Sequence, residues 1–124
     1  MNLFWTWIHY ALLKVGCGEY MEAFDFLGYL RMVVLGPLVH LKNKNLPRGV
    51  RKVESTILKQ DLDHLLGTLP TYSKLSLLSS LKNAVVLYKS LRTELYPDAV
   101  NINYNVEEKV MEYFEEIQAR SGAI

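Results

Sequence analysis

EYMEAFDFLGYLRMVVLGPLVHL, residues 19–41, is the stretch that decides the expected fold. It is apolar on more than one side, and it carries three acids, one arginine and one histidine. A helix that is apolar nearly all round is buried in a bundle or lies in a membrane. Glu22, Asp25 and Arg31 would each cost about 2.5–3.5 kcal/mol near the centre of a bilayer. We therefore predict the central helix of a soluble bundle, and no membrane partner.

The flanking sequence predicts further helices with short connections. Apolar residues recur at helical spacing over 2–15, 50–66, 73–95 and 106–119. In the central stretch, Gly28 and Gly36 allow a neighbouring helix to approach closely, and Pro37 predicts a kink near residues 33–36. No segment alternates like a strand. The prediction is a single helical domain over residues 1–124, an all-α, four- to five-helix up-and-down bundle.

The sequence also predicts the inner face of one helix and the ends of two. The helix over 50–66 is expected to be continuous, with Gly67 just after its end. Its expected inner face consists of Val53, Ile57, Leu58, Leu62 and Leu65. Asn105 is expected to cap the last helix.

Composition narrows the class of protein. The net charge of +1 argues against a general nucleic-acid binder, and one cysteine, Cys17, excludes an internal disulfide and favours the cytoplasm. The sequence contains no Gly-rich phosphate loop, no zinc motif and no Gly-x-Ser-x-Gly elbow. We therefore predict no catalytic residue and no metal ligand in this chain.

Glu19, Glu22 and Asp25 form the first candidate site. Their spacing places them on roughly one side of the first turns of the central helix. They are either solvated acids that the helix dipole favours or a surface that attracts a cationic ligand. Arg31 lies among apolar neighbours, so it either pairs with an acid on an adjacent helix or faces a ligand or another domain.

The second candidate site is basic. Lys42, Lys44, Arg48, Arg51 and Lys52 span a loop and the start of the helix expected at residue 50. Free backbone amides at such a helix start favour an anion. The run is either a solvated loop or a surface for a phosphate-bearing ligand or an acidic partner, with Arg48, Arg51 and Lys52 as its candidates. No aromatic residue is interleaved in it, which argues against nucleic acid.

Residues 4–54 carry punctuating motifs that suggest a family: GEYMEA at 18–23, YLR at 29–31 and LPRG at 46–49. Together with VVLYKSLRTELY at 85–96, they resemble the C-terminal helical, substrate-binding region of bacterial nucleotidyltransferases of the aminoglycoside (kanamycin) type. The resemblance covers nearly the whole chain. It implies a preceding α/β domain that binds Mg²⁺ and a nucleoside triphosphate. The helical domain closes over the acceptor and sometimes dimerises.

This chain lacks the Gly-Ser turn of that family and any strand to carry its paired aspartates. What the resemblance implies is therefore a substrate-side domain that is not catalytic alone. Its acids at 19, 22 and 25, with Arg31, would face a small-molecule acceptor such as an aminoglycoside-like polycation. The alternative is a non-enzymatic, HEPN-like helical interaction module that pairs with a separate minimal nucleotidyltransferase or with itself. A purely structural domain is the third interpretation.

Overall fold

The computed structural model describes residues 2–47, 49–95 and 104–122. The helices are α1 (Asn2–Gly16), α2 (Tyr20–Leu30), η1 (Arg31–Leu35), α3 (Gly36–Lys42), α4 (Val53–Thr56), α5 (Lys59–Leu66), α6 (Lys74–Leu95) and α7 (Tyr104–Gly122). No strand occurs in these ranges, and the predicted all-α class is confirmed.

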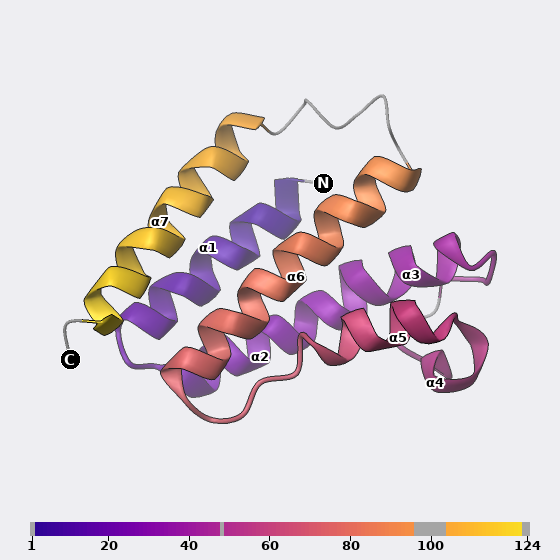
Figure 1. Cartoon of the computed structure of the whole chain (residues 1–124), viewed down its shortest axis with the longest axis horizontal. Coiled ribbons are helices and arrows are strands. Elements are labelled where there is room, and N and C mark those ends of the chain that lie inside the picture. The colour runs from indigo at the N-terminus through magenta and orange to yellow at the C-terminus, as the bar shows by residue number, and fades with distance from the viewer. Residues whose placement is uncertain (1, 48, 96–103, 123–124) are drawn as a thin grey trace.

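Helices α1 and α6 together form the centre of the packing. Helix α1 contacts α2, α6 and α7, and α7 runs beside it toward the same end of the molecule (Figure 1). The short helices α4 and α5 lie at the α3 end (Figure 1). The apolar residues that recur at helical spacing along one side of α1 are all buried: Phe4, Trp5, Ile8, Ala11, Leu12 and Val15. Across the core, the ring of Phe4 stacks on Tyr88 of α6, with centroids 3.8 Å apart and planes at 7°.

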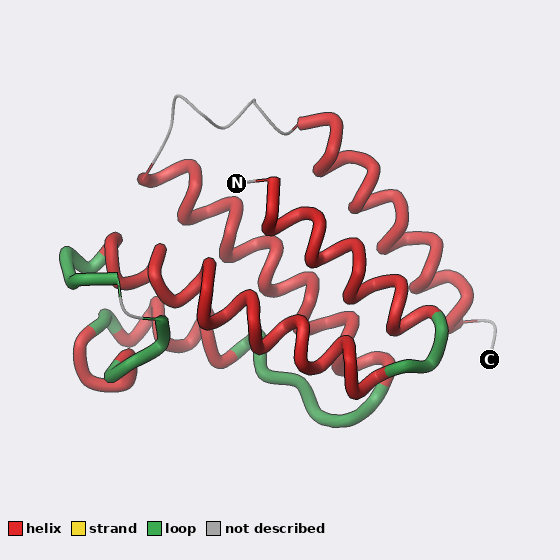
Figure 2. Tube along the Cα trace, turned by 180° about the vertical axis from the view of Figure 1, so that it is seen from behind, coloured by secondary structure: helices red, strands yellow, loops and turns green. Residues whose placement is uncertain are grey.

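The predicted central helix exists as one continuous element, α2–η1–α3, which crosses the molecule in Figure 2. Near residues 33–36, where Pro37 predicts a kink, the structure has a turn of π-helix over Arg31–Leu35. Pro37 has no amide hydrogen to donate one turn back, which disturbs the regular i to i−4 pattern. The amide of Gly36 instead donates to the carbonyl of Arg31, five residues earlier.

Gly36 allows the close approach that the sequence predicts, but the neighbour is a loop rather than a helix. A methyl group at residue 36 would overlap the carbonyl oxygen of Gly49 and would lie 2.7 Å from its carbonyl carbon. Gly49 has a φ of +61°, in the left-handed region that suits glycine. These two glycines hold the chain after Gly49 against the π-helical turn.

The prediction of one helix over 50–66 is wrong. The chain forms α4 and α5 with an extended break between them, where Ile57 has φ −121° and ψ 163°. The break turns Leu58 outward, so this predicted inner residue is 64% exposed. Val53 and Leu65 are buried as predicted, and Ile57 and Leu62 are partly buried.

One predicted helix end agrees with the structure and one differs from it. Gly67 directly follows α5, as predicted, with a φ of −65° in the right-handed region. Asn105 lies inside α7, which starts at Tyr104, and therefore does not precede that helix as a cap.

By length and hydropathy, Tyr20–Lys42 is long and apolar enough to cross a membrane. Of its most apolar window, 39% is buried inside the structure. A core helix of a bundle has the same properties, so this stretch is weak support for a membrane span.

Candidate functional site

The acidic cluster lies where the sequence places it. Glu19 directly precedes α2, and Glu22 and Asp25 follow in its first turns, all three exposed. Lys14, near the end of α1, pairs with Glu22 at 2.9 Å and with Glu19 at 3.3 Å. Its hydrogen bonds to Glu22 and then Glu19 raise the pKa of the Lys14 ammonium. Asp25 forms no ion pair within the described residues, so Lys14 pairs with two of the three carboxylates.

Aromatic side chains that the sequence did not single out continue from this cluster. The ring of Trp7 on α1 lies 5.1 Å from the rings of both Phe26 and Tyr29 on α2. Phe26 follows Glu22 by one helical turn, so acid and aromatic share one side of α2. We call Trp7, Tyr10, Phe26 and Tyr29 the α1–α2 aromatic face, and we include Leu13 of α1 and Val33 of η1, which follow Tyr10 and Tyr29 by one helical turn. Tyr10, Leu13, Tyr29 and Val33 are exposed on it.

A sequence signal for this face did exist. Trp7, Tyr10 and Leu13 recur every three residues, as one side of a helix requires. That side is adjacent to the fully buried stripe of α1. This signal is hard to recognise in the sequence alone, because the buried stripe and the neighbouring side together make helix α1 apolar over a wide angle.

Arg31 lies elsewhere and points toward α5. Its half-buried side chain donates from Nη1 to the carbonyl oxygen of Thr68 at 2.6 Å, and Nη1 lies 3.5 Å from Thr68 Oγ1. Thr68 follows the C-terminal end of α5, where the helix dipole favours a cation. Within the described ranges Arg31 pairs with no carboxylate, and burial lowers the pKa of its guanidinium. The charge of Arg31 is therefore stabilised by the C-terminal end of α5 and not by an acid on an adjacent helix.

The four residues predicted to bind substrate thus divide between two places. The acids lie at the α1–α2 junction, next to the aromatic face. Arg31 lines a separate cavity between η1, α4 and α5.

The basic cluster lies next to a shorter helix than the sequence predicts. Arg51 and Lys52 are exposed just before α4, and Lys52 has a left-handed φ of 57°. Helix α4 has only four residues, so it offers little of the aligned backbone dipole that the prediction assumed. Arg48 lies outside the described residues.

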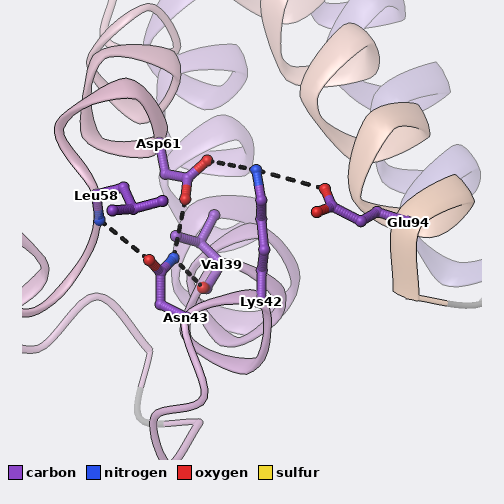
Figure 3. Close-up of polar contacts among 6 residues, drawn as sticks. All are labelled: Val39, Lys42, Asn43, Leu58, Asp61 and Glu94. Atoms are coloured by element: carbon purple, nitrogen blue, oxygen red, sulfur yellow. Dashed lines mark hydrogen bonds and ion pairs between the residues drawn. The ribbon is translucent and has the colours of Figure 1, made fainter.

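A buried polar network, not predicted from the sequence, joins α3 to α5 (Figure 3). Asp61, 1% exposed, accepts from Lys42 Nζ at 2.7 Å and from Asn43 Nδ2 at 2.9 Å. Asn43 Oδ1 also accepts from the amide of Leu58 at 3.0 Å, and Lys42 reaches Glu94 of α6 at 3.4 Å. Burial acts to raise the pKa of Asp61, but the hydrogen bonds from Lys42 and Asn43 outweigh it, so the pKa is lowered. The network fixes the α4–α5 segment against α3.

Asp61 and Asp63 have the Asp-x-Asp spacing of a metal pair, but helix α5 directs them apart. Asp61 is buried in the polar network, whereas Asp63 is exposed. No group of three or more His, Cys, Asp or Glu side chains that could hold a metal ion occurs in the described part of the chain. Cys17 is exposed.

Comparison with protein-family models, with curated protein sequences and with solved structures found no match. The function is therefore argued from the residues and their geometry.

Proposed function

We propose that this chain is the substrate-side helical domain of a nucleotidyltransferase, which binds the acceptor and is not catalytic alone. The acceptor is a polycation of the aminoglycoside type. The preceding or separate catalytic unit would supply Mg²⁺ and the nucleoside triphosphate, as the family resemblance implies.

The supporting observation is that acids and aromatic rings share one surface. Glu22 and Asp25 lie beside the α1–α2 aromatic face, whose rings pack on one another through Trp7. Carboxylates attract ammonium groups, and aromatic rings attract cations through their negative faces. A cationic sugar therefore finds both kinds of contact in one place.

Calorimetric titration of the chain with kanamycin tests the proposal. Exposed ion pairs contribute at most about 1 kcal/mol, so we expect Glu22→Gln and Asp25→Asn each to weaken binding about two- to fivefold. Tyr29→Ala should weaken it as well, and added salt should weaken it for the parent chain. Glu112→Gln is the matched control, because Glu112 is an exposed acid on α7. Kanamycin binding that is unchanged in the Glu22→Gln/Asp25→Asn double variant would contradict the proposal.

The second candidate is the non-enzymatic helical interaction module that pairs with a separate minimal nucleotidyltransferase. The observation that favours it is the exposure of Tyr10, Leu13, Tyr29 and Val33 on one face, since contiguous apolar patches often mark protein interfaces. The neighbouring genes show whether such a catalytic partner is encoded. Co-expression should then yield a complex that Tyr29→Glu disrupts and Leu58→Glu, on the distant α4–α5 turn, does not. Sedimentation of the chain alone would separate this outcome from self-association.

A further inference from the structure

The cavity beside Arg31 is the second feature with ligand-binding chemistry. It has a volume of about 190 Å³, which is the space of roughly six water molecules. Its apolar lining consists of Val50, Val53, Leu62, Leu65, Leu66 and Leu69, and Arg31 and Glu54 supply its charged groups. Leu66 and Leu69 are about half exposed, so the cavity opens to solvent through a leucine rim.

Within the described residues, the guanidinium of Arg31 makes fewer hydrogen bonds than it has donors. Arginine has five N–H donors, and both contacts of this one with polar groups of the described residues run from Nη1 to Thr68. Nη2 lies near Gly28, which has no side chain to cover it. A half-buried cation normally has an acidic partner, because burying an unpaired charge is costly. Glu54 lines the same cavity, but no carboxylate of the described residues forms an ion pair with Arg31.

The backbone around Arg31 is unusual for a purely structural residue. Arg31 is the first residue of the π-helical turn, and such turns occur frequently at functional sites. The Gly36–Gly49 contact holds the following residue, Val50, beside this turn, where it forms part of the cavity wall. The backbone irregularity therefore contributes directly to the shape of the cavity.

We propose that this cavity binds a small monocarboxylate with an apolar body. The carboxylate accepts from the guanidinium donors that Thr68 does not use, and the apolar body packs against the leucines. Glu54 adds a negative charge at the cavity, which disfavours dianions such as phosphate monoesters. The inference goes beyond the proposed acceptor site, since Arg31 reaches α5 whereas the aromatic face joins α1 to α2.

Ligand-observed NMR titration of the whole chain tests this with hexanoate, hexan-1-ol and acetate. Hexan-1-ol keeps the apolar body without the charge, and acetate keeps the charge without the body. The variants are Arg31→Gln, Arg31→Lys and Leu66→Gln, with Glu54→Gln as the acidic counterpart from the same cavity.

We expect saturable binding of hexanoate, and binding of hexan-1-ol and acetate that is about tenfold weaker. Losing a hydrogen bond to a charged group should weaken hexanoate binding about tenfold in Arg31→Gln. Arg31→Lys keeps the charge but not the planar fork, so its effect should be intermediate. Leu66→Gln should weaken binding about threefold and Glu54→Gln should tighten it about twofold.

The absence of saturable hexanoate binding overturns the proposal, as does equal binding of hexan-1-ol. If Arg31→Gln does not fold, the opposite effects expected for Leu66→Gln and Glu54→Gln still decide the question, because both side chains are exposed. Kanamycin titrations of the same variants separate this site from the acceptor site. A chain that binds kanamycin but not hexanoate contradicts only the carboxylate site, and a chain that binds hexanoate but not kanamycin contradicts only the acceptor site.

Discussion

Gly36→Ala and Gly28→Ala, two identical substitutions two helical turns apart, should change stability in opposite directions. At residue 36 the new methyl group would overlap the backbone of Gly49 and would lie 2.8 Å from the carbonyl oxygen of Arg31. At residue 28 its nearest neighbour is Arg31 Nη2 at 3.5 Å, an ordinary van der Waals contact with a flexible side chain.

The magnitudes follow from two terms. Replacing glycine by alanine inside a helix contributes about 1 kcal/mol of stability at either residue. Overpacking costs about 1–3 kcal/mol or more, and the high end applies at residue 36 because backbone atoms cannot rotate away. We therefore expect Gly36→Ala to lower the free energy of unfolding by about 2 kcal/mol. Gly28→Ala should raise it by about 0.5–1 kcal/mol.

Urea unfolding followed by tryptophan fluorescence and circular dichroism measures both changes. With roughly 4 °C per kcal/mol for a chain of this size, the melting temperatures of the two variants should differ by about 10 °C. If Gly36→Ala is as stable as Gly28→Ala, the loop at Gly49 does not approach the π-helical turn. The wall of the Arg31 cavity would then also be misplaced.

Two further predictions concern α5. Lys42→Met should lower the free energy of unfolding by about 3 kcal/mol, because it leaves the buried carboxylate of Asp61 without its cation. Glu94→Gln should lower it by less than about 0.5 kcal/mol, since Glu94 is half exposed. The lowered pKa of Asp61 adds stability that is fully present above the unfolded value of about 3.9 and is lost as pH falls through the folded pKa. The free energy of unfolding of Asp61→Asn should therefore fall less than that of the parent chain as the pH is lowered through this range. The same pH dependence in both proteins would contradict the network. Leu65→Ala, in α5, should lower the free energy of unfolding by about 3 kcal/mol, and Leu58→Ser, just before α5, should leave it nearly unchanged, as urea midpoints would show. Equal losses would instead support a continuous helix over 50–66.

The long helices follow from apolar periodicity because each buries one side against the same core. Phe4, Ile8 and Val15 on α1, and Val110, Phe114 and Ile117 on α7, lie at helical spacing and are all buried. Residues 50–66 show the same spacing but pack differently. Asn43 accepts a hydrogen bond from the amide of Leu58, which stabilises the extended break before α5. This tertiary contact crosses 15 residues and is invisible to a local pattern.

The candidate sites show the same difference between local patterns, which the sequence reveals, and contacts between distant residues, which it does not. Exposed acids at a helix start are a local property, and Glu19, Glu22 and Asp25 lie as expected. The environment of Arg31 is non-local, because its partner Thr68 is 37 residues away. Apolar neighbours in the sequence correctly indicated an unusual arginine. They did not indicate that a helix end, rather than an acid, would stabilise its charge.

The central stretch explains how a local break in a helix shapes a distant cavity. Pro37 removes a backbone donor, and the π-helical turn that precedes it begins at Arg31. Gly36, in the same irregular region, admits the backbone of Gly49, and the chain that follows supplies Val50 and Val53 to the cavity. Replacing Pro37 with alanine would restore the donor and favour a regular helix. Regular winding would rotate Arg31 relative to Gly36, so hexanoate affinity should fall in Pro37→Ala even if the free energy of unfolding rises. A chain that is both more stable and equally able to bind hexanoate would show that the π-helical turn has no part in the site.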